Sequence, residues 1–152
     1  MARSNHQIYV SVSNDLFSDM RVDKICNTLI SMGFKVTLVG RKLPESLPLS
    51  ERKYSTKRMK LLFRKGALFY AELNARLFLF LLFKRHSFLL ANDLDTLPAN
   101  YAISRVRGST LIYDSHEYFT EVPELVEGSF AKNTWLRIER FIFPKLTKVY
   151  TV

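Results

Sequence analysis

Apolar residues recur along the chain in two alternating patterns, short continuous runs and longer stretches with helical spacing. The clearest helical stretch places Val22, Ile25, Cys26, Leu29 and Ile30 on one face, and a glycine follows at position 33 as a stop signal. We therefore expect a helix over 20–32. The flanking runs at 7–13 and 35–39 predict strands, so this unit has the length that a parallel crossover needs.

The rest of the chain continues the same alternation. Strands are expected over 54–59, 88–91, 110–113 and 148–152, and helices over 65–84, 97–106 and 130–143. Strands without polar alternation are typical of a sheet buried on both faces, so the pattern predicts an α/β fold with a Rossmann-like, doubly wound parallel sheet in one domain over 1–152. Ligands of such sheets bind at the carboxyl ends of the strands, here the loops 14–21, 92–96 and 114–124.

The first of these loops contains no glycine, although a dinucleotide-binding protein would carry its glycine motif there. Without glycine the backbone cannot approach a pyrophosphate closely, which argues against NAD or FAD as a cofactor, and no other cofactor is expected. Asp15 and Asp19 are suited to sugar hydroxyls, and Arg21 to a phosphate at the helix N-terminus. The alternative is that Asp19 caps the helix and Arg21 is solvated.

The second loop carries Asn92, Asp93 and Asp95 directly after a predicted strand. The D-x-D spacing is a weak signal for a metal bound to a nucleotide diphosphate, because two such acids often occur by chance. Asp95 or Thr96 could equally cap the following helix. We expect the three residues to contact substrate and predict no metal ligand among them.

The third loop places His116 just past the predicted fifth strand, where an imidazole with a pKa near neutrality can donate or accept hydrogen bonds. We expect His116 to be catalytic and Glu117 to contact substrate. Asp114, Ser115 and His116 do not form a hydrolase triad, because side chains adjacent in sequence diverge.

Composition and charge indicate how the chain folds, where it is located and what kind of partner it binds. With 47% hydrophobic residues and a single cysteine, Cys26, the chain should fold without disulfides, and Cys26 is expected to be buried filler in a reducing cytoplasm. No secretion signal is recognised at the N-terminus, which favours a cytoplasmic location. The formal net charge of +9 indicates an anionic partner.

Seven cations and no acid occur between positions 52 and 65, interleaved with apolar residues. This pattern suits the inner face of an anionic membrane, whereas no RNA-binding motif accompanies it, so nucleic acid is disfavoured. The apolar stretch at 77–83 is no membrane span, because polar residues interrupt the length that a span requires. The expected membrane-binding or anion-binding residues are Lys57, Arg58, Lys60, Arg64 and Lys65.

Three motifs resemble those of bacterial family 4 glycosyltransferases of the GT-B fold. They are D-x-R-V-x-K at 19–24, L-A-N-D-x-D-T-L at 90–97 and Y-D-S-H-E-Y-F-T-E-V-P-E-L at 113–125, followed by Trp135, I-E-R at 138–140 and F-P-K-L at 143–146. The resemblance spans nearly the whole chain and implies its N-terminal, acceptor-side half. Many relatives have a glycine-rich first loop, which S-N-D-L-F-S-D-M replaces here.

The resemblance implies retaining transfer of a sugar from a nucleotide-sugar donor to a cell-envelope or polysaccharide acceptor, which could be a sugar or lipid-linked. It places His116 near the donor sugar and assigns most of the donor site to a C-terminal domain that this chain lacks, so the chain alone is expected to be inactive. One alternative is a stand-alone module that binds an anionic membrane or nucleic acid through its basic surface. Another is a small metal-dependent enzyme built on Asp93, Asp95 and His116.

Overall fold

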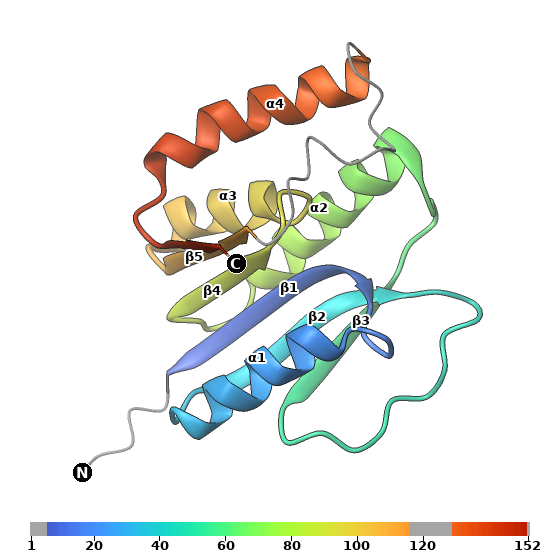
Figure 1. The fold of residues 1–152 in the computed structure, drawn as a ribbon, viewed down its shortest axis with the longest axis vertical. Helices are drawn as coiled ribbons and strands as arrows, with labels where there is room; N and C mark the ends of the chain where they lie inside the picture. Colours follow the sequence, from blue (N-terminus) through green and yellow to red (C-terminus); the bar gives the residue numbers. More distant parts are fainter. Residues whose placement is uncertain (1–5, 116–128, 152) are drawn as a thin grey trace.

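The computed structural model describes residues 6–115 and 129–151, in which six parallel strands form one sheet. Along the sheet their order is β3-β2-β1-β4-β5-β6. The expected Rossmann-like α/β fold is confirmed (Figure 1). The strands are β1 (Gln7–Asp15), β2 (Lys35–Lys42), β3 (Ser55–Lys60), β4 (Phe88–Asn92), β5 (Thr110–Ser115) and β6 (Val149–Thr151).

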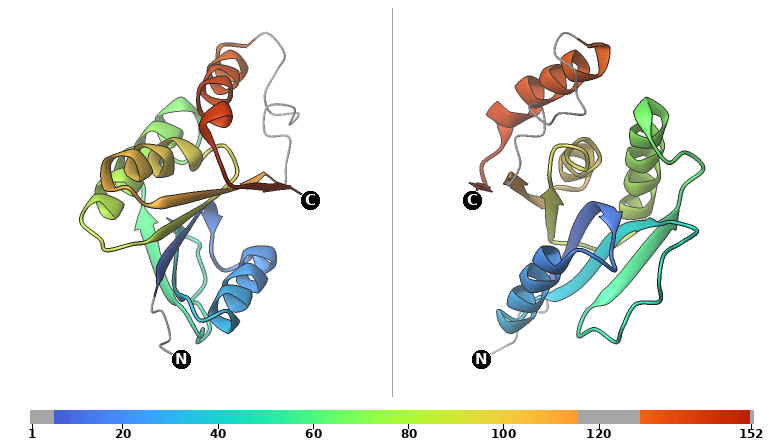
Figure 2. Two further views of the ribbon diagram at one scale, coloured as in Figure 1. Left: turned by 90° about the vertical axis from the view of Figure 1, so that its left-hand side faces the viewer. Right: turned by 45° about the vertical axis from the view of Figure 1, so that its right-hand side comes forward.

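Helices cover both faces of the sheet. Helix α1 (Met20–Ser31) packs on one face, and α2 (Gly66–Leu82) and α3 (Leu97–Arg107) pack on the other, as Figure 2 shows. Helix α4 (Phe130–Ile142), which a short 3-10 turn η2 (Phe143–Lys145) follows, lies on the side of α2 and α3. Among the described residues, none of these helices combines the length and apolar character needed to cross a bilayer.

Two hydrophobic cores result, one on each face. On the α1 side, Val10 and Leu38 of the strands pack with Val22 and Cys26 of the helix. The Cys26 side chain is fully buried, as expected, and burial raises the pKa of its thiol to about 12, which leaves it unreactive. The larger core on the other face joins strand residues to α2, α3 and α4.

Helix α2 contributes to that larger core through a stripe that its sequence conceals. Leucines and phenylalanines occupy nearly every position of its second half, yet only every fourth residue is buried. The buried residues are Phe69, Leu73, Leu77 and Leu81. Core packing therefore explains this stripe, whereas other apolar side chains of the helix, such as Leu79 at 55%, are exposed.

Candidate functional site

The strand order reverses between β1 and β4, so the chain leaves these neighbouring strands toward opposite faces of the sheet. Such a switch point opens a crevice beyond the carboxyl ends of the strands, where open α/β sheets bind ligands. The loops over 14–21 and 92–96 flank this point, as predicted. Strand β5 continues through Ser115, so Asp114 lies within the strand rather than at the start of a loop.

An ion pair links the first and third of the predicted loops. The Arg21 guanidinium, in the first turn of α1, contacts the carboxylate of Asp114 in β5. The Asp114 side chain is 1% exposed, whereas that of Arg21 is 36% exposed. The Tyr150 hydroxyl donates a hydrogen bond to the same carboxylate, and burial and this negative charge raise the Tyr150 pKa. Arg21 is therefore held in place with part of its cation open to solvent beside the switch point.

The turn after β4 is held tightly against the sheet. The Asn92 amide is buried and donates to the Ser11 carbonyl oxygen at 3.2 Å, and the Thr96 hydroxyl donates to the Asn92 carbonyl oxygen at 2.8 Å. Asp93 has a φ of 62°, a left-handed conformation rare outside glycine, and its backbone N–H donates to the Asp114 carbonyl oxygen at 3.0 Å. Strained conformations of this kind gather at binding sites because the surrounding structure enforces them.

Asp95 is buried beneath this turn rather than presented to solvent. Asn74 of α2 bridges the turn to α3, because its amide donates to the Asp95 carbonyl oxygen at 2.8 Å and its oxygen accepts from the Ala99 N–H at 3.0 Å. Thr96 is the N-cap residue of α3, but its side chain makes no capping hydrogen bond. Within residues 6–115 and 129–151, no group of three metal-binding side chains is assembled.

The Asp15 carboxylate is engaged inside the protein. It accepts hydrogen bonds from the Phe17 N–H at 3.2 Å and the Arg58 guanidinium at 2.8 Å, and from the Ser46 hydroxyl. Burial opposes its charge, but the bonds from Ser46 and Phe17 and the nearby Arg58 outweigh this and hold the Asp15 pKa below its ordinary value. Asp15 therefore fixes the connection between β2 and β3, and its predicted substrate contact stays a prediction.

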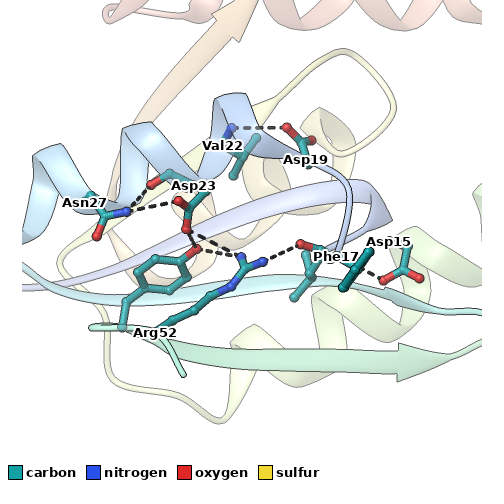
Figure 3. A network of polar contacts seen from close by, with 9 residues as sticks. Asp15, Phe17, Asp19, Val22, Asp23, Asn27 and Arg52 are labelled. Carbon is teal, nitrogen blue, oxygen red and sulfur yellow. Dashed lines mark hydrogen bonds and ion pairs between the residues drawn. The ribbon is translucent and has the colours of Figure 1, made fainter. Parts of the chain in front are cut away.

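Asp19 caps helix α1, as the alternative interpretation of its position proposed, because its carboxylate accepts a hydrogen bond from the Val22 N–H at 3.1 Å (Figure 3). A neighbouring polar network was not predicted from the sequence. Arg52 donates to the Tyr54 hydroxyl at 2.7 Å and lies 3.7 Å from Asp23, to which Tyr54 donates in turn. No local pattern marks this network, because Asp23 and Tyr54 are 31 positions apart.

The basic run is only partly available to a partner. The run itself contains no acid, but acids elsewhere in the chain oppose two of its cations, because Arg58 is paired with Asp15 and Arg52 with Asp23. Four of the five predicted anion-binding residues are exposed, namely Lys57, Lys60, Arg64 and Lys65. Large apolar side chains are exposed among them, including Leu62 at 80% and Phe63 at 43%.

His116 and Glu117 lie outside the described residues. The prediction that His116 is catalytic therefore stays a prediction, as does the metal site that would combine it with Asp93 and Asp95.

No family model and no curated protein sequence matches the chain. Solved structures match it in fold. Sucrose-phosphate synthase from Thermosynechococcus elongatus aligns with 95% of the chain at a TM-score of 0.68 and 13% identity. UGT2 of Phytolacca americana, complexed with UDP-2fluoro-glucose and pterostilbene, aligns with 80% at 0.51 and 16% identity. The glycosyltransferase SsfS6 of Streptomyces sp. SF2575 aligns with 95% at 0.51 and 13% identity.

These likenesses show the Rossmann-like fold of GT-B glycosyltransferases. The chain spans less than half the length of each of the three proteins, at 42%, 34% and 47%.

Proposed function

We propose that this chain is the N-terminal, acceptor-side domain of a GT-B glycosyltransferase, which transfers a sugar from a nucleotide-sugar donor to a cell-envelope or polysaccharide acceptor. The observation that carries the proposal is the fold, which matches glycosyltransferases over nearly the whole chain. The structure of UGT2 with UDP-2fluoro-glucose supports a nucleotide sugar as donor. A second domain would hold most of that donor, and the three motifs favour retaining chemistry of the family 4 type.

Arg21 is the described residue best suited to a phosphate of the nucleotide-sugar donor, which leaves with the nucleotide when the sugar is transferred. Its guanidinium is partly exposed at the helix N-terminus, and the pairing with Asp114 orients it. The turn over 92–96 would present polar groups to the acceptor from the other side of the switch point. His116 would add a hydrogen bond to the donor sugar that strengthens as the glycosidic bond breaks.

Peripheral attachment to the cytoplasmic face of a membrane is part of the proposal. Lys60, Arg64 and Lys65 stand beside the exposed Leu62 and Phe63, so cations and apolar side chains occupy one surface. Such a surface suits anionic headgroups and the acyl boundary below them. It would bring the domain to a lipid-linked acceptor.

Replacement of Arg21 tests the site. In the protein that carries this domain, Arg21→Met should lower kcat/KM for the nucleotide sugar by about 10-fold or more, because a charged hydrogen bond is worth about 1.5–3 kcal/mol. Lys24→Met is the matched control, since Lys24 is exposed one turn further along α1. Normal kcat/KM in a folded Arg21→Met variant would remove Arg21 from the site.

His116→Ala should lower kcat by roughly 10²–10³-fold with little effect on folding, because a positioned hydrogen bond that strengthens in the transition state acts on turnover. Single-turnover kinetics together with a thermal melt separate the two effects. A folded His116→Ala protein with near-normal kcat would contradict the assignment.

A further inference from the structure

A hollow of about 570 Å³ opens at the carboxyl ends of β2 and β3, away from the switch point. Its volume falls in the range of small-molecule sites. Two segments line it, residues 41–44 from the end of β2 and residues 60–64 from the end of β3. Of its basic residues, Lys60 and Arg64 were predicted from the sequence to bind a membrane or an anion, whereas Arg41 and Lys42 were not.

The lining is strongly cationic. It contains Arg41, Lys42, Lys60 and Arg64 and no carboxylate. Lys42 and Lys60 are partners in the register of the two parallel strands, so two like charges stand side by side at one end of the sheet. Like charges that face each other across strands are destabilising, and an anion between them would relieve the repulsion.

Arg41 contributes a cation to the lining that two contacts hold in place. One terminal nitrogen of its guanidinium donates to the Arg64 carbonyl oxygen at 3.0 Å, and the guanidinium lies 4.7 Å from the centre of the Phe69 ring. These contacts fix the side chain. Its Nε is buried and has no hydrogen-bond acceptor among the described residues, so any contact with a ligand would come from the terminal nitrogens of the guanidinium.

Glu72 of α2 holds the wall of the hollow in shape. Its carboxylate accepts hydrogen bonds from the N–H groups of Leu62 and Phe63, at 2.8 and 2.9 Å, and from Arg76 at 2.7 Å. The segment over 61–64 is therefore ordered before any ligand arrives, which lowers the entropic cost of binding. The same bonds commit the Glu72 carboxylate to the protein backbone and to Arg76, so it is not left to neutralise the lining.

The edge of the hollow is apolar. Leu61 is half-buried, whereas Leu62 and Phe63 expose 80% and 43% of their surfaces. Cationic groups inside and apolar side chains at the rim match a ligand that joins a phosphate to a hydrocarbon chain.

We propose that this hollow binds the phosphate or diphosphate group of the acceptor, with the apolar rim against the chain attached to it. That the ligand is an acceptor rests on the proposed glycosyltransferase function. The binding of a phosphate group does not, because it follows from the lining alone.

Titration calorimetry with inorganic pyrophosphate tests the site without any transfer reaction. Wild-type protein should bind pyrophosphate, and the double variant Lys42→Gln/Lys60→Gln should bind at least 10-fold more weakly. The control Lys24→Gln/Lys35→Gln removes the same charge from exposed lysines outside the lining and should bind normally. Arg64→Gln gives a second reduction if the double variant folds poorly. Absence of pyrophosphate binding, or equal weakening in both double variants, would overturn the proposal.

A vesicle arm identifies the source of the phosphate. If the phosphate is carried by lipid, phosphatidylcholine vesicles that contain phosphatidate should bind the wild type, release it on addition of pyrophosphate and bind the Lys42→Gln/Lys60→Gln variant weakly. Pyrophosphate binding without vesicle binding supports the same site with a soluble phosphorylated ligand. Failure of sugar transfer with intact pyrophosphate binding would contradict the glycosyltransferase function and leave the phosphate site standing.

Discussion

Arg21 and Asp114 illustrate how single residues acquire their roles from partners distant in the chain. They are 93 positions apart, and only the parallel arrangement of β1, β4 and β5 brings them together. The placement of Arg21 at a helix N-terminus could be predicted from local sequence. Its partner could not, and neither could the pairing of Asp15 with Arg58, because no periodicity encodes contacts between separate loops.

His86 supports a prediction about how the free energy of unfolding depends on pH. Its Nε2 lies 3.0 Å from the Leu81 carbonyl oxygen and its Nδ1 2.6 Å from the Ser109 hydroxyl, a pair of partners that suits the neutral ring. Burial lowers the His86 pKa, so on acidification through about 6.5 the unfolded chain takes up the proton first. The free energy of unfolding should therefore fall from pH 7 toward pH 5.

Urea unfolding at several pH values measures this effect. The His86→Gln variant, which has no titrating ring, should show a shallower decline over the same pH range. An equal decline in both proteins would show that His86 does not contribute.

Asp93 and Asp95 support a prediction about the effect of a chelator. Asp95 is buried and the backbone around both residues is bonded to neighbouring strands and helices, which favours a structural or acceptor-facing role. A chelator should leave sugar transfer by the protein that carries this domain nearly unchanged. If the chelator abolished transfer and added manganese or magnesium restored it, the result would indicate a metal bound by this turn.

At the scale of elements, periodicity was a reliable guide. The expected helix over 20–32 and the strand over 88–91 agree with α1 and β4 to within one residue at each end. Boundaries at the carboxyl ends of strands were less predictable, because polar residues such as Asp15 and Asp114 continue the ladder there. The stripe of α2 was also hidden, since apolar residues on its exposed side obscure the buried ones.

Gly40 supports a prediction for β2. A methyl group at this position would come within 2.8 Å of the Asn14 carbonyl oxygen and 2.4 Å of the Leu16 side chain. The backbone of the first loop cannot yield without moving Asp15 and its bonds, so Gly40→Ala should destabilise the fold by about 1–3 kcal/mol. Chemical denaturation measures the change, and an unchanged midpoint would show that the loop adapts freely.

At the scale of the whole molecule, net charge predicted an anionic partner, and the fold decides where that charge is available. Internal ion pairs use Arg21, Arg52 and Arg58, whereas other cations gather at the carboxyl ends of β2 and β3. The sequence could indicate this basic segment because its residues are contiguous. It could not indicate the hollow, because Arg41 and Lys42 come from a separate strand.

Vesicle co-sedimentation tests the membrane proposal. Binding should require anionic lipid and weaken with salt, because the screening length shrinks from about 10 Å at 0.1 M to about 3 Å at 1 M. Neutralisation of the exposed Lys57, Lys60, Arg64 and Lys65 should reduce it sharply. Neutralisation of Arg58, which is paired with Asp15, should cost folding stability instead. Equal binding to neutral vesicles would contradict an electrostatic attachment.

The central claim is that this fold serves sugar transfer from a nucleotide sugar. The most direct test incubates the protein that carries this domain with a panel of UDP-, GDP- and dTDP-sugars and a lipid-phosphate acceptor, and measures released nucleoside diphosphate together with glycosylated acceptor. We predict that one donor is consumed only when the acceptor is present, with one sugar transferred for each nucleotide released, and that Arg21→Met lowers both signals while Lys24→Met lowers neither. No release and no binding of any nucleotide sugar in the panel would contradict the account.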